Sequence, residues 1–274
     1  MEESMNTSYI EKYFSLDGRK AVVTGASSGI GRAIAIALAN FGAEAALLGR
    51  SKEGLSITHQ EIIESGGICE DYIVDISDTD AQKAFFQDYM KKHDRMDIFI
   101  ANAGINRRAE LQDASLEDIE ALLKTNYVGT LFGMIQASNI MKEQRSGSIV
   151  VITSINGLSP LINQAVYSSI KFGLEGAMRA LAGSMAQYGV RVNSCAPGCV
   201  HSAGNQHIFS IDEFRKSKEA SIPLGKIGNP EEIGNVVASM VSDAYSFMTG
   251  STILVDGGEL LRPKQKQPQT DAIK

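Results

Sequence analysis

Short apolar runs alternate along the chain with longer segments whose apolar residues recur at a helical spacing. The apolar runs predict strands at Ala21–Thr24, Ala45–Leu48, Tyr72–Val74, Ile98–Ala101, Ile149–Thr153, Val190–Ala196 and Thr252–Val255. The segments between them predict helices over 29–41, 52–65, 78–92, 115–143, 163–188 and 230–243. Because parallel strands need crossover helices, this alternation predicts an α/β fold with one doubly wound parallel sheet and helices on both faces.

The first predicted strand runs straight into a glycine-rich turn, Thr24-Gly25-Ala26-Ser27-Ser28-Gly29-Ile30-Gly31, which opens the first helix. Gly25 permits the tight turn, Gly29 lets backbone N–H groups approach a pyrophosphate, and Gly31 allows close helix–strand packing. The helix N-terminus adds positive potential there. The segment therefore predicts a Rossmann-type nucleotide site that includes Ser27, Ser28 and Ile30. A purely structural strand–turn–helix is the alternative.

At 274 residues and 43% hydrophobic, the chain suits one large dinucleotide-binding catalytic domain, which we place at residues 1–262. Residues 201–222 interrupt the strand–helix rhythm after the sixth predicted strand and predict a mobile substrate lid. Residues 263–274 are polar and proline-containing without periodicity, which predicts a disordered tail.

The formal net charge of −6 argues against a nucleic-acid partner. Three cysteines, Cys69, Cys195 and Cys199, form no Cys-x-x-Cys pair, and the four histidines lack ligand spacing, so we expect neither disulfides nor a metal. The N-terminus has no apolar signal core, and no run approaches eighteen apolar residues. We therefore expect a cytoplasmic protein without membrane contact.

Tyr167 and Lys171 are four residues apart in a predicted helix, so their side chains emerge on one face. A nearby ammonium favours the phenolate, and we expect Lys171 to lower the pKa of Tyr167 toward values useful for a general acid/base. Ser154 ends the fifth predicted strand, where its hydroxyl can bond a substrate oxygen beside Tyr167. The spacing also occurs by chance in structural helices.

The glycine turn has the spacing Gly-x-x-x-Gly-x-Gly. With Asp75, Asn102-Ala103-Gly104, Asn126, Ser154, Tyr167-x-x-x-Lys171, Pro197-Gly198 and Asp256-Gly257-Gly258 in that order, the chain resembles the short-chain dehydrogenase/reductase family over roughly residues 16–262. Ala101, Ile170 and Ser202 depart from the usual family pattern. The resemblance implies an oxidoreductase in which hydride moves between a nicotinamide cofactor and a substrate carbon.

The resemblance also implies roles for individual residues. Lys171 would bind the nicotinamide ribose, and Asn126 would anchor a water that relays protons from Lys171. The remaining cofactor contacts that it implies are Asp75 and Ile76 near the adenine, Asn102, Ala103 and Gly104 along the adenosine, and Pro197, Val200 and Ser202 at the nicotinamide amide. The alternative for Asn126 is a polar residue within a helix that bonds the backbone and marks a kink.

Cofactor preference depends on the end of the second predicted strand, Leu48-Gly49-Arg50. A carboxylate at this point would bond the ribose 2′-hydroxyl and repel a 2′-phosphate, whereas Gly49 is followed by a cation. Arg50 can pair with the phosphate, so NADP(H) is favoured and NAD(H) stays possible. Ser28 stands where many NADP-preferring relatives carry a cation, and an exposed Arg50 without a phosphate role is the alternative.

Arg107 and Arg108 follow Asn102-Ala103-Gly104-Ile105-Asn106, a run that looks like the gluconate 5-dehydrogenase branch, whose substrates are sugar acids. We expect these arginines, Ser154 and Asn156 to contact an anionic keto or hydroxy substrate. An equal alternative is that both arginines lie on a solvated helix cap or at a subunit contact. Reduction of a 3-oxoacyl thioester and a catalytically silent nucleotide sensor are the competing functions. Apolar residues on several faces of helices 115–143 and 163–188 predict a homodimer or homotetramer.

Overall fold

The computed structural model describes residues 2–201 and 210–261, with side chains from Ser8 onward. Seven parallel strands form one sheet, in the order β3-β2-β1-β4-β5-β6-β7. They are β1 (Lys20–Thr24), β2 (Glu44–Gly49), β3 (Ile68–Ile73), β4 (Ile98–Ala101), β5 (Gly147–Ile152), β6 (Val190–Pro197) and β7 (Thr252–Val255). The order reverses between β1 and β4, so the predicted doubly wound Rossmann-type sheet is confirmed.

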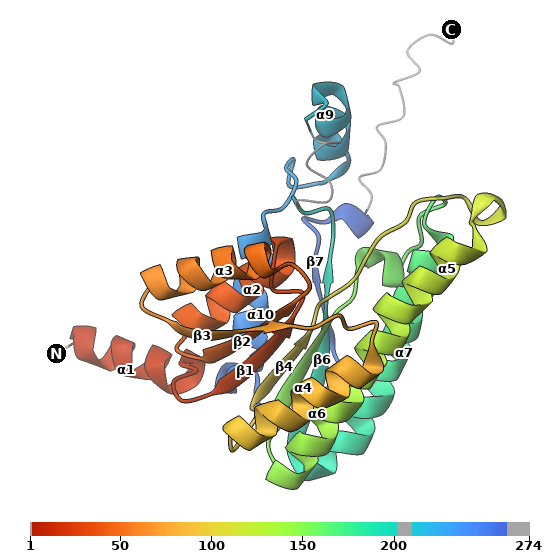
Figure 1. Ribbon diagram of the computed structural model, residues 1–274. Coiled ribbons are helices and arrows are strands. Elements are labelled where there is room, and N and C mark those ends of the chain that lie inside the picture. Colours follow the sequence, from red (N-terminus) through yellow and green to blue (C-terminus); the bar gives the residue numbers. More distant parts are fainter. Residues whose placement is uncertain (1, 202–209, 262–274) are drawn as a thin grey trace, which may run out of the picture.

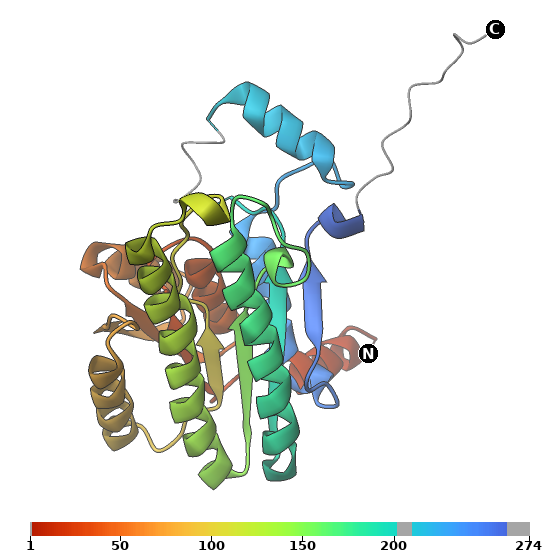
Figure 2. The ribbon, with the colours of Figure 1, turned by 90° about the vertical axis from the view of Figure 1, so that its right-hand side faces the viewer.

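Helices cover both faces of the sheet (Figures 1 and 2). One layer holds α2 (Gly29–Asn40), α3 (Lys52–Glu64) and α10 (Pro230–Val241), and the other holds α4 (Thr79–Lys92), α5 (Leu116–Leu122), α6 (Thr130–Gln144) and α7 (Ala165–Met185). Successive strand residues point to opposite layers: Val23 packs with α2 and α10, and Val22 packs with α4 and α6. Burial on both faces explains why β1, β2, β4 and β5 read as continuous apolar runs.

The helix predicted over 115–143 is interrupted. Between α5 and α6, the segment Leu123–Gly129 (η2) is a π-helix, which adds a residue to the turn. Gly129 ends it against the backbone of Ile76, where a Cβ would meet the Ile76 carbonyl oxygen at 2.2 Å. The helix predicted over 163–188 also ends early, at Met185, and a 3-10 turn (η4, Ala186–Tyr188) follows.

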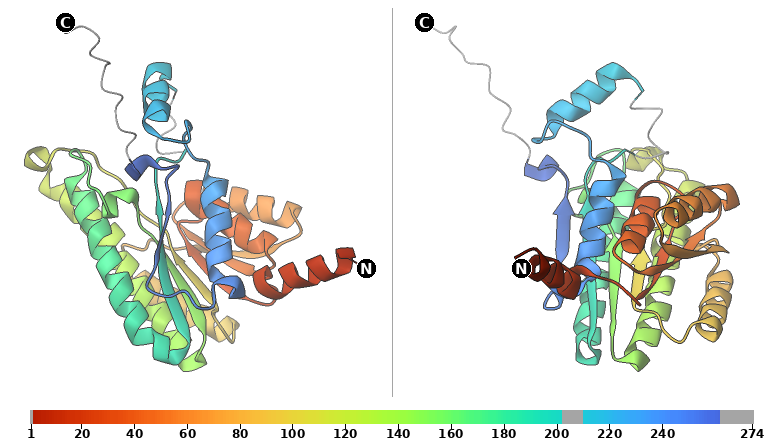
Figure 3. Two further views of the ribbon diagram at one scale, coloured as in Figure 1. Left: turned by 180° about the vertical axis from the view of Figure 1, so that it is seen from behind. Right: turned by 90° about the vertical axis from the view of Figure 1, so that its left-hand side faces the viewer.

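Two elements at the periphery differ from the sequence prediction. Strand β3 covers Ile68–Ile73 rather than 72–74, because this edge strand has one paired neighbour and carries the polar residues Glu70 and Asp71, which hide its apolar period. Helix α1 (Glu2–Phe14) was not predicted. It projects from the body beside η5 (Asp243–Tyr245), as Figure 3 shows.

Beyond β6, helix α9 (Asp212–Ser221) stands above the carboxyl ends of the strands (Figures 1 and 2). It occupies the second half of the predicted lid at 201–222. The first half, from residue 202 to 209, and the predicted tail at 263–274 lie outside the described residues. Short 3-10 turns η1 (Leu111–Asp113), η3 (Ile155–Gly157) and η6 (Glu259–Leu261) flank the same edge of the sheet.

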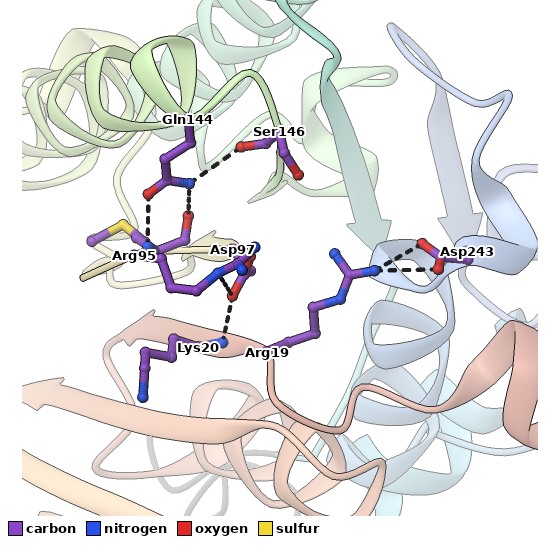
Figure 4. A network of polar contacts seen from close by, with 8 residues as sticks. Arg19, Lys20, Arg95, Asp97, Gln144, Ser146 and Asp243 are labelled. Atoms are coloured by element: carbon purple, nitrogen blue, oxygen red, sulfur yellow. Dashed lines mark hydrogen bonds and ion pairs between the residues drawn. The ribbon is translucent and has the colours of Figure 1, made fainter. Parts of the chain in front are cut away.

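A polar network holds the opposite, amino-terminal edge together (Figure 4). The Asp97 side chain is 1% exposed, accepts the backbone N–H of Lys20 at 2.8 Å and pairs with Arg95. Gln144 bonds both backbone groups of Met96 at 2.9 Å. These contacts tie the starts of β1 and β4 to the end of α6. In the ranges that the structure describes, none of the helices has the length and apolar character of a membrane span.

Candidate active site

A cavity of about 860 Å³ lies at the carboxyl edge of the sheet, where the turn after β1 meets the ends of β2, β4 and β5 and one face of α7. This edge is the expected ligand position in a doubly wound sheet. The sequence-predicted residues that line it are Gly25, Ser27, Ser28, Gly29, Ile30, Gly31, Arg50, Asp75, Ile76, Asn102, Ala103, Gly104, Arg107, Arg108, Ser154, Tyr167, Lys171 and Pro197. Segments far apart in the sequence therefore share one cavity.

Three of the expected site residues that the structure describes, Asn126, Asn156 and Val200, do not line this cavity. Asn156 is 5% exposed and donates its amide to Gln164, so its side chain is used inside the protein rather than offered to a substrate. Val200 is buried and its backbone pairs with Gly228. The positions of Asn156 and Val200 were not predictable from spacing, because both depend on how the loops after β5 and β6 pack. Ser202 lies outside the described residues.

The glycine turn has the close contacts that its sequence predicts. Gly25 and Gly29 adopt φ of 71° and 55°, which favours glycine. A Cβ on Gly31 would lie 2.1 Å from the Gly25 carbonyl oxygen. Ser28 caps α2 in an extended conformation without a side-chain hydrogen bond, so the first N–H groups of the helix face the cavity without a local acceptor. The turn therefore offers a cradle of backbone donors to an anion.

The Thr24 hydroxyl fixes the neighbouring loop to this turn. It accepts the backbone N–H groups of Asn102 at 2.9 Å and Ala103 at 3.1 Å, and it donates to the Ile100 carbonyl at 3.1 Å. The Asn102 amide in turn donates to the Thr24 carbonyl at 2.9 Å. These bonds hold the ends of β1 and β4 in one wall.

Asp75 follows β3 and faces Arg50 at the end of β2. Arg50 Nη1 lies 3.7 Å from Asp75 Oδ2. Burial alone would raise the pKa of Asp75, but hydrogen bonds from Ser77 and the Arg50 charge lower it below its ordinary value. Both side chains are substantially exposed, at 64% and 40%. The guanidinium is therefore accessible from the cavity.

Tyr167, Lys171 and Ser154 meet on the wall formed by α7 and the end of β5. The Lys171 Nζ lies 5.5 Å from the centre of the Tyr167 ring and donates to the Ile152 carbonyl at 2.8 Å. Burial raises the pKa of Tyr167 to about 12, and an interaction with the Ser154 hydroxyl acts in the opposite direction. Burial lowers the pKa of Lys171 to about 8, against the attraction of Glu175.

The expectation that Lys171 lowers the pKa of Tyr167 is thus wrong for the protein alone. Loss of water around the phenol outweighs the stabilisation of its anion, and the ammonium is directed to a backbone carbonyl. At neutral pH the site therefore holds a protonated phenol, which can donate its proton. Beside it lies the Lys171 ammonium, which loses its proton near pH 8.

Asn126 lies at the centre of the π-helical segment and is 1% exposed. Its side chain accepts the Ile105 N–H and donates to the Ile105 carbonyl, both at 2.7 Å. The Asn126 side chain therefore matches the alternative interpretation, in which it bonds the backbone at an irregular point of the helix. Because Ile105 lines the cavity, Asn126 positions the cavity wall from behind.

Arg107 and Arg108 line the cavity but have different surroundings. Arg107 Nε lies 3.2 Å from Asp118 Oδ1. Arg108 makes no ion pair within the described residues, and its charge acts on the Cys199 thiol. The lining as a whole carries the cations Arg50, Arg107, Arg108 and Lys171 and the single carboxylate Asp75, in a chain of net charge −6. The cavity is therefore electropositive.

Some residues near the cavity were not singled out from the sequence. Ser51, Asn106 and Thr125 line it. Glu175 lies one helical turn beyond Lys171 and acts on its charge; its i+4 spacing from Lys171 is the signal that could have found it. Across the described ranges, no three His, Cys, Asp or Glu residues gather as a metal site requires, and all three cysteines are free thiols.

Comparisons with known proteins agree with this geometry. A family model described as enoyl-(acyl carrier protein) reductase matches residues 25–259. The 3-oxoacyl-[acyl-carrier-protein] reductase of Aquifex aeolicus is 36% identical over 245 residues, which covers 89% of this chain and 98% of that protein.

Two solved structures resemble this chain at a comparable sequence identity. A putative NAD(P)-dependent gluconate 5-dehydrogenase from Beutenbergia cavernae, with NADP bound at low occupancy, has a TM-score of 0.86 and 35% identity, covering 90% of this chain and 99% of that one. A putative 2-deoxy-D-gluconate 3-dehydrogenase from Agrobacterium tumefaciens with bound NADP has a TM-score of 0.84 and 32% identity, covering 91% and 99%.

Proposed function

The chain belongs to the short-chain dehydrogenase/reductase family and is an oxidoreductase of alcohol and carbonyl groups; from that premise we propose that it interconverts a secondary alcohol and a ketone of a sugar acid or polyol with NADP(H). The observation that carries the proposal is the shared cavity, which joins the glycine turn to Ser154, Tyr167 and Lys171. A nucleotide seated on the turn can therefore reach the proton donor within the same cavity.

The residues present fit a dinucleotide phosphate. The free N–H groups at the start of α2 suit the pyrophosphate, and the absence of a Cβ at Gly25 and Gly31 allows the turn to pack tightly behind it. The exposed guanidinium of Arg50 suits a 2′-phosphate, which a carboxylate at the end of β2 would repel. Two structural relatives hold NADP.

The proposed chemistry assigns separate tasks to the wall residues. When bound, the cofactor gives or takes the hydride at the substrate carbon. The Ser154 hydroxyl donates a hydrogen bond to the substrate oxygen and holds it beside Tyr167. In reduction, Tyr167 gives its phenolic proton to that oxygen, and the reverse step in oxidation returns it. The nearby Lys171 ammonium stabilises the phenolate that this transfer leaves.

The proton-relay water that Asn126 was expected to anchor stays a prediction, because the side chain of Asn126 bonds both backbone groups of Ile105. The sugar-acid preference rests on the electropositive lining and on the gluconate dehydrogenases among the structural relatives. Arg107 and Arg108 are the proposed contacts of the substrate carboxylate. A homo-oligomeric state and a cytoplasmic location stay predictions.

The 3-oxoacyl thioester is a second candidate substrate, favoured by the 36% identity to the Aquifex reductase. That reading needs a surface for an acidic carrier protein, and the net charge of −6 disfavours it. The nucleotide sensor is disfavoured because binding a nucleotide requires no proton donor such as Tyr167.

A substrate panel tests the proposal. Purified protein is given NADPH with a keto-sugar acid, a neutral ketose and acetoacetyl-coenzyme A, and NADPH oxidation is followed by absorbance. We expect kcat/KM for the keto acid to exceed that for the neutral ketose by tenfold or more, which is about 1.4 kcal/mol. Faster reduction of acetoacetyl-coenzyme A would favour the thioester function. NADPH binding without oxidation of any compound would favour the sensor.

A further inference from the structure

Glu175 is a buried carboxylate that does not line the cavity. It lies on α7 one helical turn beyond Lys171, and its side chain is 3% exposed. Burying an isolated carboxylate is costly, so such a group persists where its charge is paired and its oxygens are hydrogen-bonded. The surroundings of Glu175 meet both conditions.

Three hydroxyls, from the segments of three neighbouring strands, converge on Glu175. Thr153, which follows β5, donates to Oε1 at 2.6 Å, and Thr252 at the start of β7 donates to Oε2 at 2.6 Å. Ser194 in β6 lies 3.0 and 3.1 Å from the two oxygens. The two shortest distances are typical of hydroxyls bound to an ionised carboxylate. These bonds join α7 to β5, β6 and β7 directly behind Ser154.

The charge of Glu175 is placed to act on Lys171. Lys171 is itself 5% exposed, and within the described part of the chain its ammonium donates one hydrogen bond, to the neutral Ile152 carbonyl. Burial drives this lysine toward its neutral form, and the Glu175 carboxylate opposes that loss of charge. The second cation near Glu175, Arg179, lies at 3.5 Å and is 56% exposed, so water shares its charge.

We propose that Glu175 is a positioning residue for the Tyr167–Lys171 pair: its buried carboxylate, one helical turn beyond Lys171, is the counter-charge of that ammonium, and its three hydroxyl bonds fix α7 against β5, β6 and β7. The inference rests on the proposed function, because the ammonium matters through Tyr167. The four-residue spacing places Tyr167, Lys171 and Glu175 at successive turns on one face of α7.

The titratable and charged groups around the pair are few. Lys171 and Arg179 face Glu175 from α7, and Cys195 faces it from β6. Burial and the Glu175 charge raise the pKa of Cys195 to about 12, so its thiol stays neutral over the working range. Tyr167 faces Lys171 from the preceding turn. A change in Lys171 titration on removing Glu175 is therefore attributable to that carboxylate.

The experiment measures Lys171 directly, without turnover. In full-length protein with ¹³Cε-labelled lysine, the Lys171 resonance is assigned with a Lys171→Met variant and titrated by NMR. We expect Glu175→Gln to move the Lys171 midpoint down by about one pH unit. Glu175→Met removes the same charge without adding an amide and must give the same direction, which covers the case in which the Gln variant does not fold.

Two controls separate a charge effect from a structural one. Thr252→Val removes one hydroxyl bond but keeps the carboxylate, so we expect a lower melting temperature and an unchanged Lys171 midpoint. Glu143→Gln removes an equivalent charge from the exposed end of α6 and should change neither. An unchanged Lys171 midpoint in folded Glu175→Gln and Glu175→Met, or an equal change in Thr252→Val, would overturn the inference.

Turnover then tests the link to catalysis. If the wild type reduces a substrate of the panel, kcat/KM should decline at a lower pH in Glu175→Gln than in the wild type. This difference should match the difference between their Lys171 midpoints. If the midpoint moves and the wild type reduces none of the compounds, the proposed function fails while the counter-charge role of Glu175 is supported. If the wild type is active and neither the midpoint nor the limb moves, the inference alone fails.

Discussion

Arg50 and Asp75 form an exposed ion pair at the cavity wall, with Arg50 Nη1 3.7 Å from Asp75 Oδ2. Such a pair is weak in water, so Arg50 can exchange this partner for a more strongly charged phosphate at small cost. Asp75 itself lines the cavity, where the predicted contact with the adenine would place it. The ion pair with Asp75 therefore holds the Arg50 guanidinium near the place where we propose that it binds the 2′-phosphate of NADP(H).

The first prediction concerns that guanidinium. Arg50→Ala should weaken NADPH binding about ten- to a hundredfold, because a hydrogen bond to a charged group contributes about 1.5–3 kcal/mol. NADH binding should change by less than about threefold, since it lacks the 2′-phosphate. Dissociation constants from cofactor fluorescence measure both. Equal losses for the two cofactors would contradict the NADP(H) assignment.

Tyr167→Phe removes the phenolic proton and little volume. We expect kcat to fall by about three orders of magnitude, as for loss of a general acid, while the NADPH dissociation constant changes less than about twofold. Single-turnover absorbance and cofactor fluorescence separate these quantities. Retention of a tenth or more of the wild-type kcat would show that another group supplies the proton.

The two arginines of the loop after β4 should differ in effect. Arg107 is already paired with Asp118, whereas Arg108 makes no ion pair within the described part of the chain. We expect Arg108→Ala to raise KM for a keto acid about tenfold, Arg107→Ala to raise it less, and neither to alter KM for a neutral ketose. Unchanged KM values for the keto acid in both variants would argue against a sugar-acid substrate.

Activity should decline at alkaline pH. Burial lowers the pKa of Lys171 from 10.5 to about 8, so a step that needs its ammonium loses about half its rate near that pH and about tenfold per unit above it. Between these two values the unfolded chain binds more protons than the folded one, so Lys171 makes the folded state more stable as pH rises. Parallel rate and melting profiles thus distinguish titration from unfolding; a flat rate profile to about pH 9.5 would contradict the assignment.

The network in Figure 4 should affect stability and not the active site. Asp97→Asn removes the charge of a carboxylate that is 1% exposed, and we expect a loss of about 2 kcal/mol in the free energy of unfolding. Asp243→Asn is the matched control, because its pair with Arg19 is exposed and should contribute less than about 1 kcal/mol. Urea unfolding measures both. NADPH affinity should be unchanged, since the network lies at the opposite edge of the sheet.

The sequence predicted well what depends on neighbours along the chain. The alternating periods located the strands and helices. Because the carboxyl ends of parallel strands meet at one edge of the sheet, the sequence also predicted that the glycine turn, Ser154 and Tyr167 lie close together. Strand β3 was misplaced because an edge strand need not be apolar on both faces. The π-helical segment was missed because its extra residue is set by the approach of Gly129 to Ile76, which no local pattern records.

What the sequence determined by itself is the order of elements, the cradle for phosphates and the residue types at the cavity, because periodicity and glycine placement act over a few residues. Only the tertiary structure decided that Asn156 turns inward, that Arg107 is paired while Arg108 is not, and that the phenol of Tyr167 is made less acidic. These properties depend on burial and on partners far away in the chain, such as Glu175 with its hydroxyls from three strands. Water is removed from the Tyr167 phenol only when the layers pack, and that removal raises its pKa.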